Sequence, residues 1–151
     1  MKKFKDICYM TQKGVKEYMG KYLTSKKYEV INEDGFLYAK GDVPVLLVAH
    51  MDTVHKEQCT SIIKDGEKLS SPQGIGGDDR CGVFIIANLV KKYHCSVLLL
   101  EDEEIGTVGA RKFAKTDYIK SLDVNFMIEF DRKGNNDAVF YSCDNEDFTN
   151  H

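Results

Sequence analysis

The sequence lacks the features that mark fibrous, disulfide-rich and zinc-finger proteins. Its 151 residues include only two prolines and twelve glycines, which excludes a collagen-like or low-complexity chain. The cysteines are five in number and form no C-x-x-C pair, so neither a disulfide framework nor a zinc ribbon is expected. Cysteines of this kind suit the reducing cytosol.

Long apolar runs and an excess of basic residues are also missing. The runs Val43–Ala49 and Val83–Ala87 are far shorter than the roughly 20 residues that span a bilayer. Lys2 and Lys3 are not followed by an apolar segment, so no signal peptide is predicted. The formal net charge of −3 provides no basic field for nucleic acid. We therefore expect a cytoplasmic protein that binds neither membranes nor nucleic acid.

The chain instead has the length and the alternating pattern of one α/β domain covering residues 1–151. Helical periodicity predicts a helix from about Phe4 to Tyr22, and Asp34-Gly35 predicts a hairpin between strands at 28–31 and 36–39. Further patterns indicate buried strands at 43–49, 96–100 and 124–130, short strands at 61–64 and 68–70, helices at 78–93 and 106–115, and, as one interpretation, a last strand at 138–142. This order predicts a three-layer α/β sandwich with a mostly parallel central sheet flanked by helices.

Acidic and imidazole side chains lie where the buried strands end. Because sites in open α/β sheets gather at the carboxyl ends of strands, these side chains are expected to converge. They are His50 and Asp52 after the first strand, residues 101–104 after the second, Glu129 and Asp131 at the third, and Asp78 and Asp79 at the start of a helix.

Each of these residues taken alone is more simply a turn or cap residue. Their joint placement is harder to explain in that way, because several carboxylates brought together repel one another unless a cation neutralises them. Imidazole and carboxylate ligands suit Zn²⁺, with Mn²⁺ or Co²⁺ as substitutes. Asp79 and Arg80 are expected either to fix the helix entry by hydrogen bonding or to form a local cap with an ion pair.

Four segments, taken in order, resemble the co-catalytic di-zinc exopeptidases, a group that includes aminopeptidases and carboxypeptidases. Residues 50–54 (H-M-D-T-V) are similar to the H-x-D-T-V segment of that group, and residues 78–82 (D-D-R-C-G) to its bridging-aspartate segment. Residues 103–110 (E-E-I-G-T-V-G-A) are similar to its E-E-x-G-x-x-G-A segment, and residues 128–131 to its next metal carboxylate. The resemblance implies a metal-dependent exopeptidase, aminopeptidase-like, that hydrolyses peptides or N-acyl amino acids. The first segment is more similar to that of carboxypeptidases and deacylases, whereas the second is more similar to that of glutamyl and tetrahedral aminopeptidases.

The resemblance also implies a role for each residue. His50 and Asp131 would bind the first zinc, Asp78 would bridge two zinc ions, Glu104 would bind the second, Asp52 would orient His50, and Glu103 would be the general base. Glu129 competes with Asp131 as the ligand. We prefer Asp131 because it follows the apolar run, where the end of the strand would present it.

The sequence departs from the family where a second histidine is needed for the second metal. Only twenty residues follow Asp131, and the only histidine among them is His151. We therefore expect no lid or dimerisation domain after Asp131, and a sheet that is incomplete at its C-terminal end. The 26 positions from Asp52 to Asp78 are likewise too few for the insert domain of the tetrahedral aminopeptidases. Three hypotheses follow: a truncated peptidase, a homo-oligomer whose partner subunit supplies the histidine, or an impaired homologue with one metal that binds metal or a partner protein.

Overall fold

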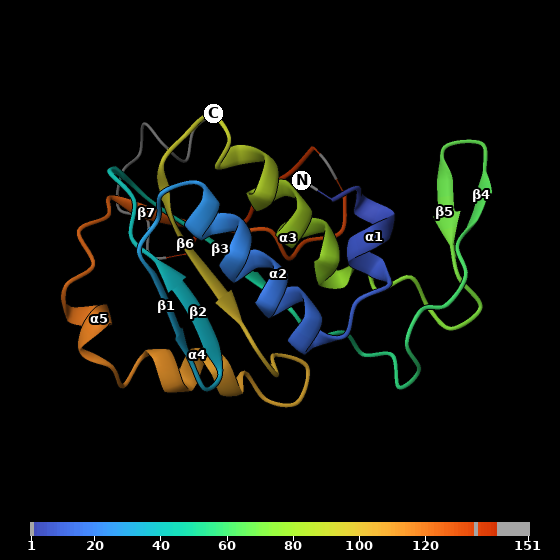
Figure 1. Ribbon diagram of the computed structural model, residues 1–151, viewed down its shortest axis with the longest axis horizontal. Helices are drawn as coiled ribbons and strands as arrows, with labels where there is room; N and C mark the ends of the chain where they lie inside the picture. The colour runs from blue at the N-terminus through green and yellow to red at the C-terminus, as the bar shows by residue number, and fades with distance from the viewer. Residues whose placement is uncertain (1, 135, 142–151) are drawn as a thin grey trace.

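A computed structural model describes residues 2–134 and 136–141 and contains a five-stranded mixed sheet. The strands are β1 (Val30–Glu33), β2 (Phe36–Ala39), β3 (Val43–His50), β6 (Cys95–Leu100) and β7 (Phe126–Glu129), arranged in the order β1-β2-β6-β3-β7. Strands β6, β3 and β7 are parallel, whereas the β1–β2 hairpin joins β6 in antiparallel fashion (Figure 1). The predicted α/β class and the predicted hairpin are confirmed.

Helices cover both faces of this sheet, as predicted for a three-layer sandwich. Helices α1 (Phe4–Cys8), α2 (Gln12–Ser25) and α3 (Gly77–Leu89) lie on one face, and α4 (Val108–Phe113) packs on the other with α5 (Asp117–Lys120) beside it (Figure 1). Alternate residues of β3 serve the two layers, because successive side chains of a strand point to opposite faces. Leu47 and Ala49 face the first layer, and Leu46 and Val48 face the second.

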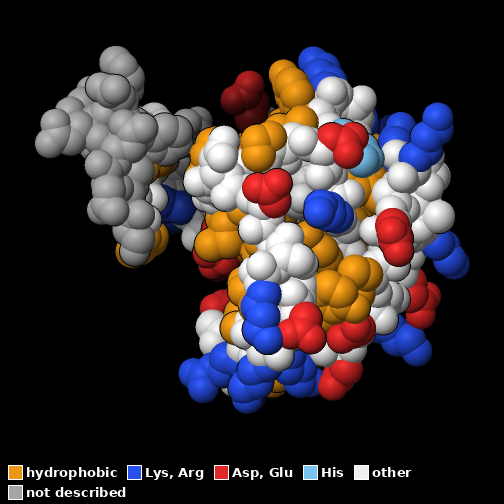
Figure 2. Space-filling model, turned by 90° about the vertical axis from the view of Figure 1, so that its left-hand side faces the viewer, with side chains coloured by type: hydrophobic (Ala, Val, Ile, Leu, Met, Phe, Trp, Pro, Cys, Tyr) orange, Lys and Arg blue, Asp and Glu red, His pale blue; other side chains and the backbone are white. Residues whose placement is uncertain are grey.

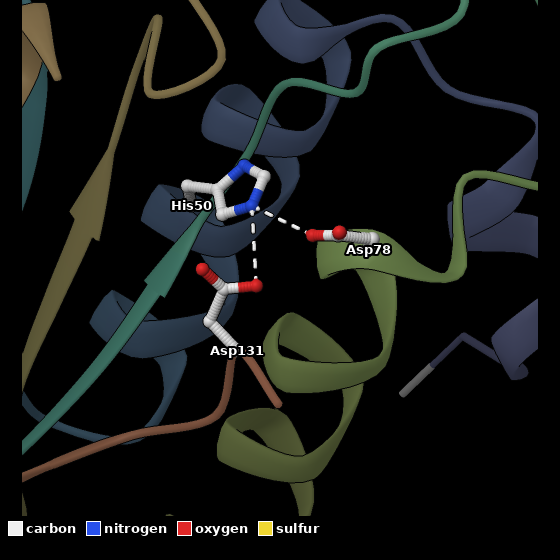
Figure 3. Close-up of side chains that lie close together, drawn as sticks. All are labelled: His50, Asp78 and Asp131. Carbon is white, nitrogen blue, oxygen red and sulfur yellow. Dashed lines mark hydrogen bonds and ion pairs between the residues drawn. The ribbon is translucent and has the colours of Figure 1, made fainter. Parts of the chain in front are cut away.

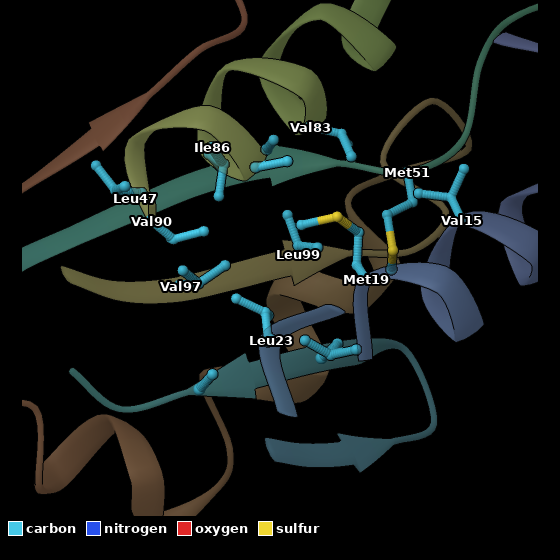
Figure 4. Packing of buried hydrophobic residues seen from close by; sticks show 14 of the residues in the cluster. Val15, Met19, Leu23, Leu47, Met51, Val83, Ile86, Val90, Val97 and Leu99 are labelled. Atoms are coloured by element: carbon cyan, nitrogen blue, oxygen red, sulfur yellow. The ribbon is translucent and has the colours of Figure 1, made fainter. Parts of the chain in front are cut away.

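The first layer is held by an apolar stripe along each of its two longer helices (Figure 4). Val15, Met19 and Leu23 recur every four residues of α2, and all three are fully buried. This spacing keeps them on one face of the helix, against Leu99 of the central strand β6. The stripe therefore fixes α2 across the sheet and brings its N-terminus near the carboxyl end of β6.

The continuous helix predicted from Phe4 to Tyr22 is wrong, because the chain forms two helices there. Thr11 has extended backbone angles, and its side chain accepts a hydrogen bond from the Gly14 backbone N–H at 3.1 Å. A threonine in this conformation is a helix N-cap, so α2 begins after it and α1 ends before it.

The prediction of a buried strand at 124–130 is also wrong, since β7 is shorter and all four of its residues are exposed. Within the described part of the chain, β7 pairs only with β3 and lies at the edge of the sheet. An apolar run does not reveal whether its strand is central or at an edge. Residues 138–141 of the predicted last strand are not in a strand, and residue 142 lies outside the described residues.

The predicted short strands at 61–64 and 68–70 form a separate hairpin, β4 (Ile63–Asp65) with β5 (Lys68–Ser70), that projects from the main body (Figure 1).

Acidic, basic and apolar side chains are interspersed on the face shown in Figure 2, and no field of one sign covers it. Among residues 2–134 and 136–141, no helix combines the length and the hydrophobicity needed to cross a membrane.

Candidate metal centre

One imidazole and two carboxylates meet at the carboxyl edge of the sheet (Figure 3). His50 ends β3, Asp78 lies in the first turn of α3, and Asp131 follows β7. The Nε2 atom of His50 is 3.0 Å from Oδ1 of Asp78 and 3.7 Å from Oδ1 of Asp131. One ligand atom from each of the three residues lies within 4.8 Å of the others, which is close enough for a single metal ion to contact all of them.

The register of two parallel strands explains why Asp131 meets His50. Val48 of β3 is paired with Glu129, the last residue of β7, and His50 and Asp131 each follow two positions after this last pair. The two chains therefore leave the paired region side by side, and the His50 Nε2 and Asp131 Oδ1 atoms lie 3.7 Å apart. The structure thus brings Asp131 into the group, whereas neither potential metal group among the described residues includes Glu129.

Asp52 orients the His50 ring through the ring nitrogen, Nδ1, that does not face the other two acids. Its Oδ1 atom is 3.1 Å from Nδ1 of His50, and its two carboxylate oxygens also accept the backbone N–H groups of Glu103 and Glu104, both at 3.0 Å. Burial by itself would raise the pKa of Asp52, but these hydrogen bonds lower it to about 2. An ionised carboxylate only accepts, so Nδ1–H of His50 donates to it, and Nε2 faces the two other acids as a metal ligand requires.

The same hydrogen bonds fix the position of Glu103 and Glu104. With His50 these two glutamates form a second group whose ligand atoms lie within 4.8 Å of one another. Their loop is anchored further by Gln12 of α2, which donates to the Asp102 carboxylate at 2.9 Å and accepts the Asp102 backbone N–H at 3.1 Å. The helix face that packs on the sheet therefore also positions the two glutamates beside His50.

The electrostatics are those of a site that favours a cation. Burial of the His50 ring opposes its charge, but hydrogen bonds to Asp52 and Asp78 outweigh burial and raise the pKa of His50 to about 9. Burial and the neighbouring Asp78 carboxylate raise the pKa of Asp131 to about 6. Burial, followed by the charge of Asp78, raises the pKa of Glu104 as well. A divalent ion would relieve this repulsion, and one imidazole with carboxylate oxygens is a donor set that fits Zn²⁺.

The sequence predicts that Asp79 and Arg80 fix the start of α3 by hydrogen bonding or by a cap with an ion pair, and Asp79 does form a hydrogen bond within the first turns of α3. Its Oδ1 atom accepts the Gly82 backbone N–H at 2.8 Å, and burial raises the pKa of Asp79 to about 8. A Cβ atom on Gly82 would come within 2.3 Å of this carboxylate, which explains the glycine at that position. Arg80 makes no ion pair with any of the described residues, and its 4% exposure was not predicted from the sequence.

The remaining histidines are not part of the metal centre as the structure describes it. His94 lies at the far end of the strands, stacked on Tyr28 and 3.0 Å from the Asp42 carboxylate. His55 lies on the exposed loop after β3. The last histidine, His151, lies outside the described residues.

Comparisons with known proteins show the class of fold. No protein-family model and no curated protein sequence matches the chain. The fold is similar to that of the aminopeptidase PepT from Bacillus cereus ATCC 10987, with a TM-score of 0.69 and 18% sequence identity. The match covers 87% of this chain and 42% of that structure, so the chain spans less than half the length of that aminopeptidase. The shared feature is the α/β sandwich, at whose carboxyl edge His50, Asp78 and Asp131 lie.

Proposed function

We propose that this chain carries the metal-binding and catalytic part of a metal-dependent exopeptidase, aminopeptidase-like, that hydrolyses peptides or N-acyl amino acids in the cytoplasm. The observation that carries the proposal is the convergence of His50, Asp78 and Asp131 with the Glu103–Glu104 pair at one edge of the sheet. The PepT-like fold supports it, because the sheet edge is where a site is expected in such a fold.

The residues present suit the hydrolysis of an amide bond. Zinc, when bound, would lower the pKa of a bound water molecule and polarise the carbonyl group that is attacked. His50, Asp78 and Asp131 would hold the ion, while Asp52, which accepts the Nδ1–H of His50, keeps Nε2 directed at the two other ligands. Glu103 is the general base: it takes the proton of the attacking water and passes it to the leaving amine.

Glu104 is the ligand that we propose for a second metal, with Asp78 as the bridge. A carboxylate suits this role because its two oxygens can each contact a different ion. Glu104 and Asp78 alone leave that second ion short of ligands, so a histidine from elsewhere in the assembly, such as a partner copy, would complete it.

The test is the zinc content and the peptidase activity of purified protein. Two zinc ions per chain, measured by mass spectrometry, and hydrolysis of aminoacyl-anilides or dipeptides are expected. Glu103→Gln should keep the zinc and lose at least about 10²-fold in rate, since general-base catalysis contributes roughly that much. Glu67→Gln, in the exposed turn between β4 and β5, is the matched control and should have no effect.

A second candidate is an impaired homologue that binds metal or a partner protein without catalysis. The small number of ligands for a second ion favours it. One weakly held zinc ion, with no turnover on any peptide or N-acyl amino acid, would support this candidate over the enzyme. If His50→Ala left both the zinc content and the thermal stability unchanged, the metal centre itself would be disproved.

A further inference from the structure

A pocket of about 250 Å³ lies beside the metal centre and has no role in the chemistry proposed above. Its walls come from the end of α1 with the start of α2, the loop after β3, the glycine turn before α3, and Arg80 of α3 itself. Asp52 and Thr53 line it, so it borders the carboxylate that orients His50. A cavity of about 150 Å³ is enough to bind benzene, so this pocket has room for a group the size of an amino-acid side chain.

The pocket holds a buried cation without a hydrogen-bonded partner. Arg80 lines the pocket with 4% of its surface exposed, and its Nε and Nη1 atoms are fully buried without an acceptor among the described residues. Buried donors of a charged group that remain unsatisfied cost about 1–3 kcal/mol or more, so an arginine in this state favours an incoming acceptor.

No described carboxylate satisfies this guanidinium. Asp52 is near enough to favour the charge of Arg80, yet its two oxygens already accept N–H groups from His50, Glu103 and Glu104. The exposed rim of the pocket carries Lys56 and Glu57, whose charges oppose each other. Asp52 and Arg80 carry the two charges of the interior, and of these only Arg80 has buried polar atoms that no described residue satisfies.

We propose that this pocket binds a carboxylate group, held by the guanidinium of Arg80, as a subsite beside the metal centre. A guanidinium presents its N–H donors in a planar fork that matches the two oxygens of a carboxylate. Insofar as the subsite serves the proposed peptidase, an assignment that rests on that function, the bound group is a carboxylate of the substrate. It belongs either to an acidic side chain or to the C-terminus of a short peptide.

Calorimetric titration of the full, zinc-loaded chain with glutarate tests this proposal, with glutaramide as the uncharged control. Glutarate is expected to bind with a Kd of about 1 mM, and glutaramide at least tenfold more weakly. Arg80→Met should weaken glutarate binding at least about tenfold, because a charge-assisted hydrogen bond is lost. The matched control Arg111→Met changes an exposed arginine on α4 and should leave binding unchanged.

His50→Ala separates this pocket from the metal centre. The variant lacks a zinc ligand and should still bind glutarate, whereas carboxylates that bind to zinc would lose their site. Unchanged glutarate binding in Arg80→Met would overturn the proposal, and so would the loss of glutarate binding in His50→Ala, which would place the carboxylate at the metal centre. Absence of peptidase activity would not, since glutarate binding is measured without turnover.

Two further measurements make the result independent of the stability of the variant. In the unmodified protein, the NMR signal of Arg80 Nε–H should shift on addition of glutarate while amide signals of β1 stay in place; an unmoved Arg80 signal contradicts the proposal. Chelated protein is then titrated with Ala-Ala, which has only a terminal carboxylate, and with Glu-alaninamide, which has only the side-chain one. The compound that binds more tightly identifies the source of the carboxylate, and the proposal is overturned if neither compound binds.

Discussion

Asp52 offers the sharpest test of how the metal centre is organised. Its carboxylate accepts three N–H groups, one from the His50 ring and two from the backbone of Glu103 and Glu104. Asp52→Asn keeps the shape of the side chain, but it replaces one accepting oxygen with an NH₂ group. At least one of the three donors then faces another donor, so the substitution disturbs either the His50 tautomer or the glutamate loop.

The magnitude follows from the number and kind of these bonds. Loss of one hydrogen bond to a charged group costs about 1.5–3 kcal/mol, and substitutions behind a metal-bound histidine reduce metal affinity roughly 10–100-fold. We therefore expect Asp52→Asn to raise the Kd for zinc by about 10–100-fold, measured by competition with a chromogenic chelator. The number of zinc ions per chain at saturation should stay the same, since no ligand has been removed.

The matched control is Asp42→Asn, which changes another Asp–His pair far from the site. Asp42 is 3.0 Å from the His94 ring, and 90% of its side chain is exposed, so zinc affinity should not respond. Equal zinc affinity in Asp52→Asn and the unmodified protein would refute the orienting role of Asp52. Equal losses in Asp52→Asn and Asp42→Asn would refute the specificity of the effect.

Three further outcomes are expected. Gly109→Ala should destabilise the fold by about 3 kcal/mol in urea unfolding, because a Cβ there would lie 2.2 Å from the Gly35 carbonyl oxygen. The helical Gly14→Ala, whose Cβ meets nothing nearer than 3.4 Å, should instead stabilise it by up to about 1 kcal/mol, and equal effects of the two would contradict this reasoning. Leu99→Ala, in the fully buried centre of β6, should cost about 2–5 kcal/mol, whereas Leu69→Ala in the separate β4–β5 hairpin should cost less than about 1 kcal/mol. Zinc at 100 times its Kd should stabilise the chain by about 2.7 kcal/mol and raise its Tm by roughly 5–10 °C, a gain that EDTA reverses; an unchanged Tm would show that no zinc binds the folded state.

Much of the fold could be predicted from the sequence because its signals are local. The apolar run at 43–49 is typical of a strand covered on both sides, and Asp34-Gly35 between two short strands is typical of a hairpin. The helical stripe of α3 and the acids at strand ends are equally local, so the edge of the sheet that carries His50, Asp52 and Glu103 was predictable.

Other features depend on contacts between distant parts of the chain. The apolar run at 124–130 resembles a buried strand, yet β7 is exposed because it has a single neighbour in the described sheet. The break between α1 and α2 depends on one capping bond of Thr11 within an otherwise helical pattern. Likewise, D-D-R-C-G contains nothing to show that Arg80 is buried beside a pocket, with no acceptor in the part of the chain that the structure describes.

The sequence by itself therefore determined the kind of layers and the candidate ligands, because apolar period and strand-end acids are properties of neighbouring residues. Only the tertiary structure decided which acids meet. The pairing of β3 with β7 brings Asp131, two residues beyond the last pair, to within 3.7 Å of His50, and the packing of α2 anchors the loop that carries Glu103. The physical reason is that strand pairing and helix packing join residues dozens of positions apart, and no local pattern encodes the distances between them.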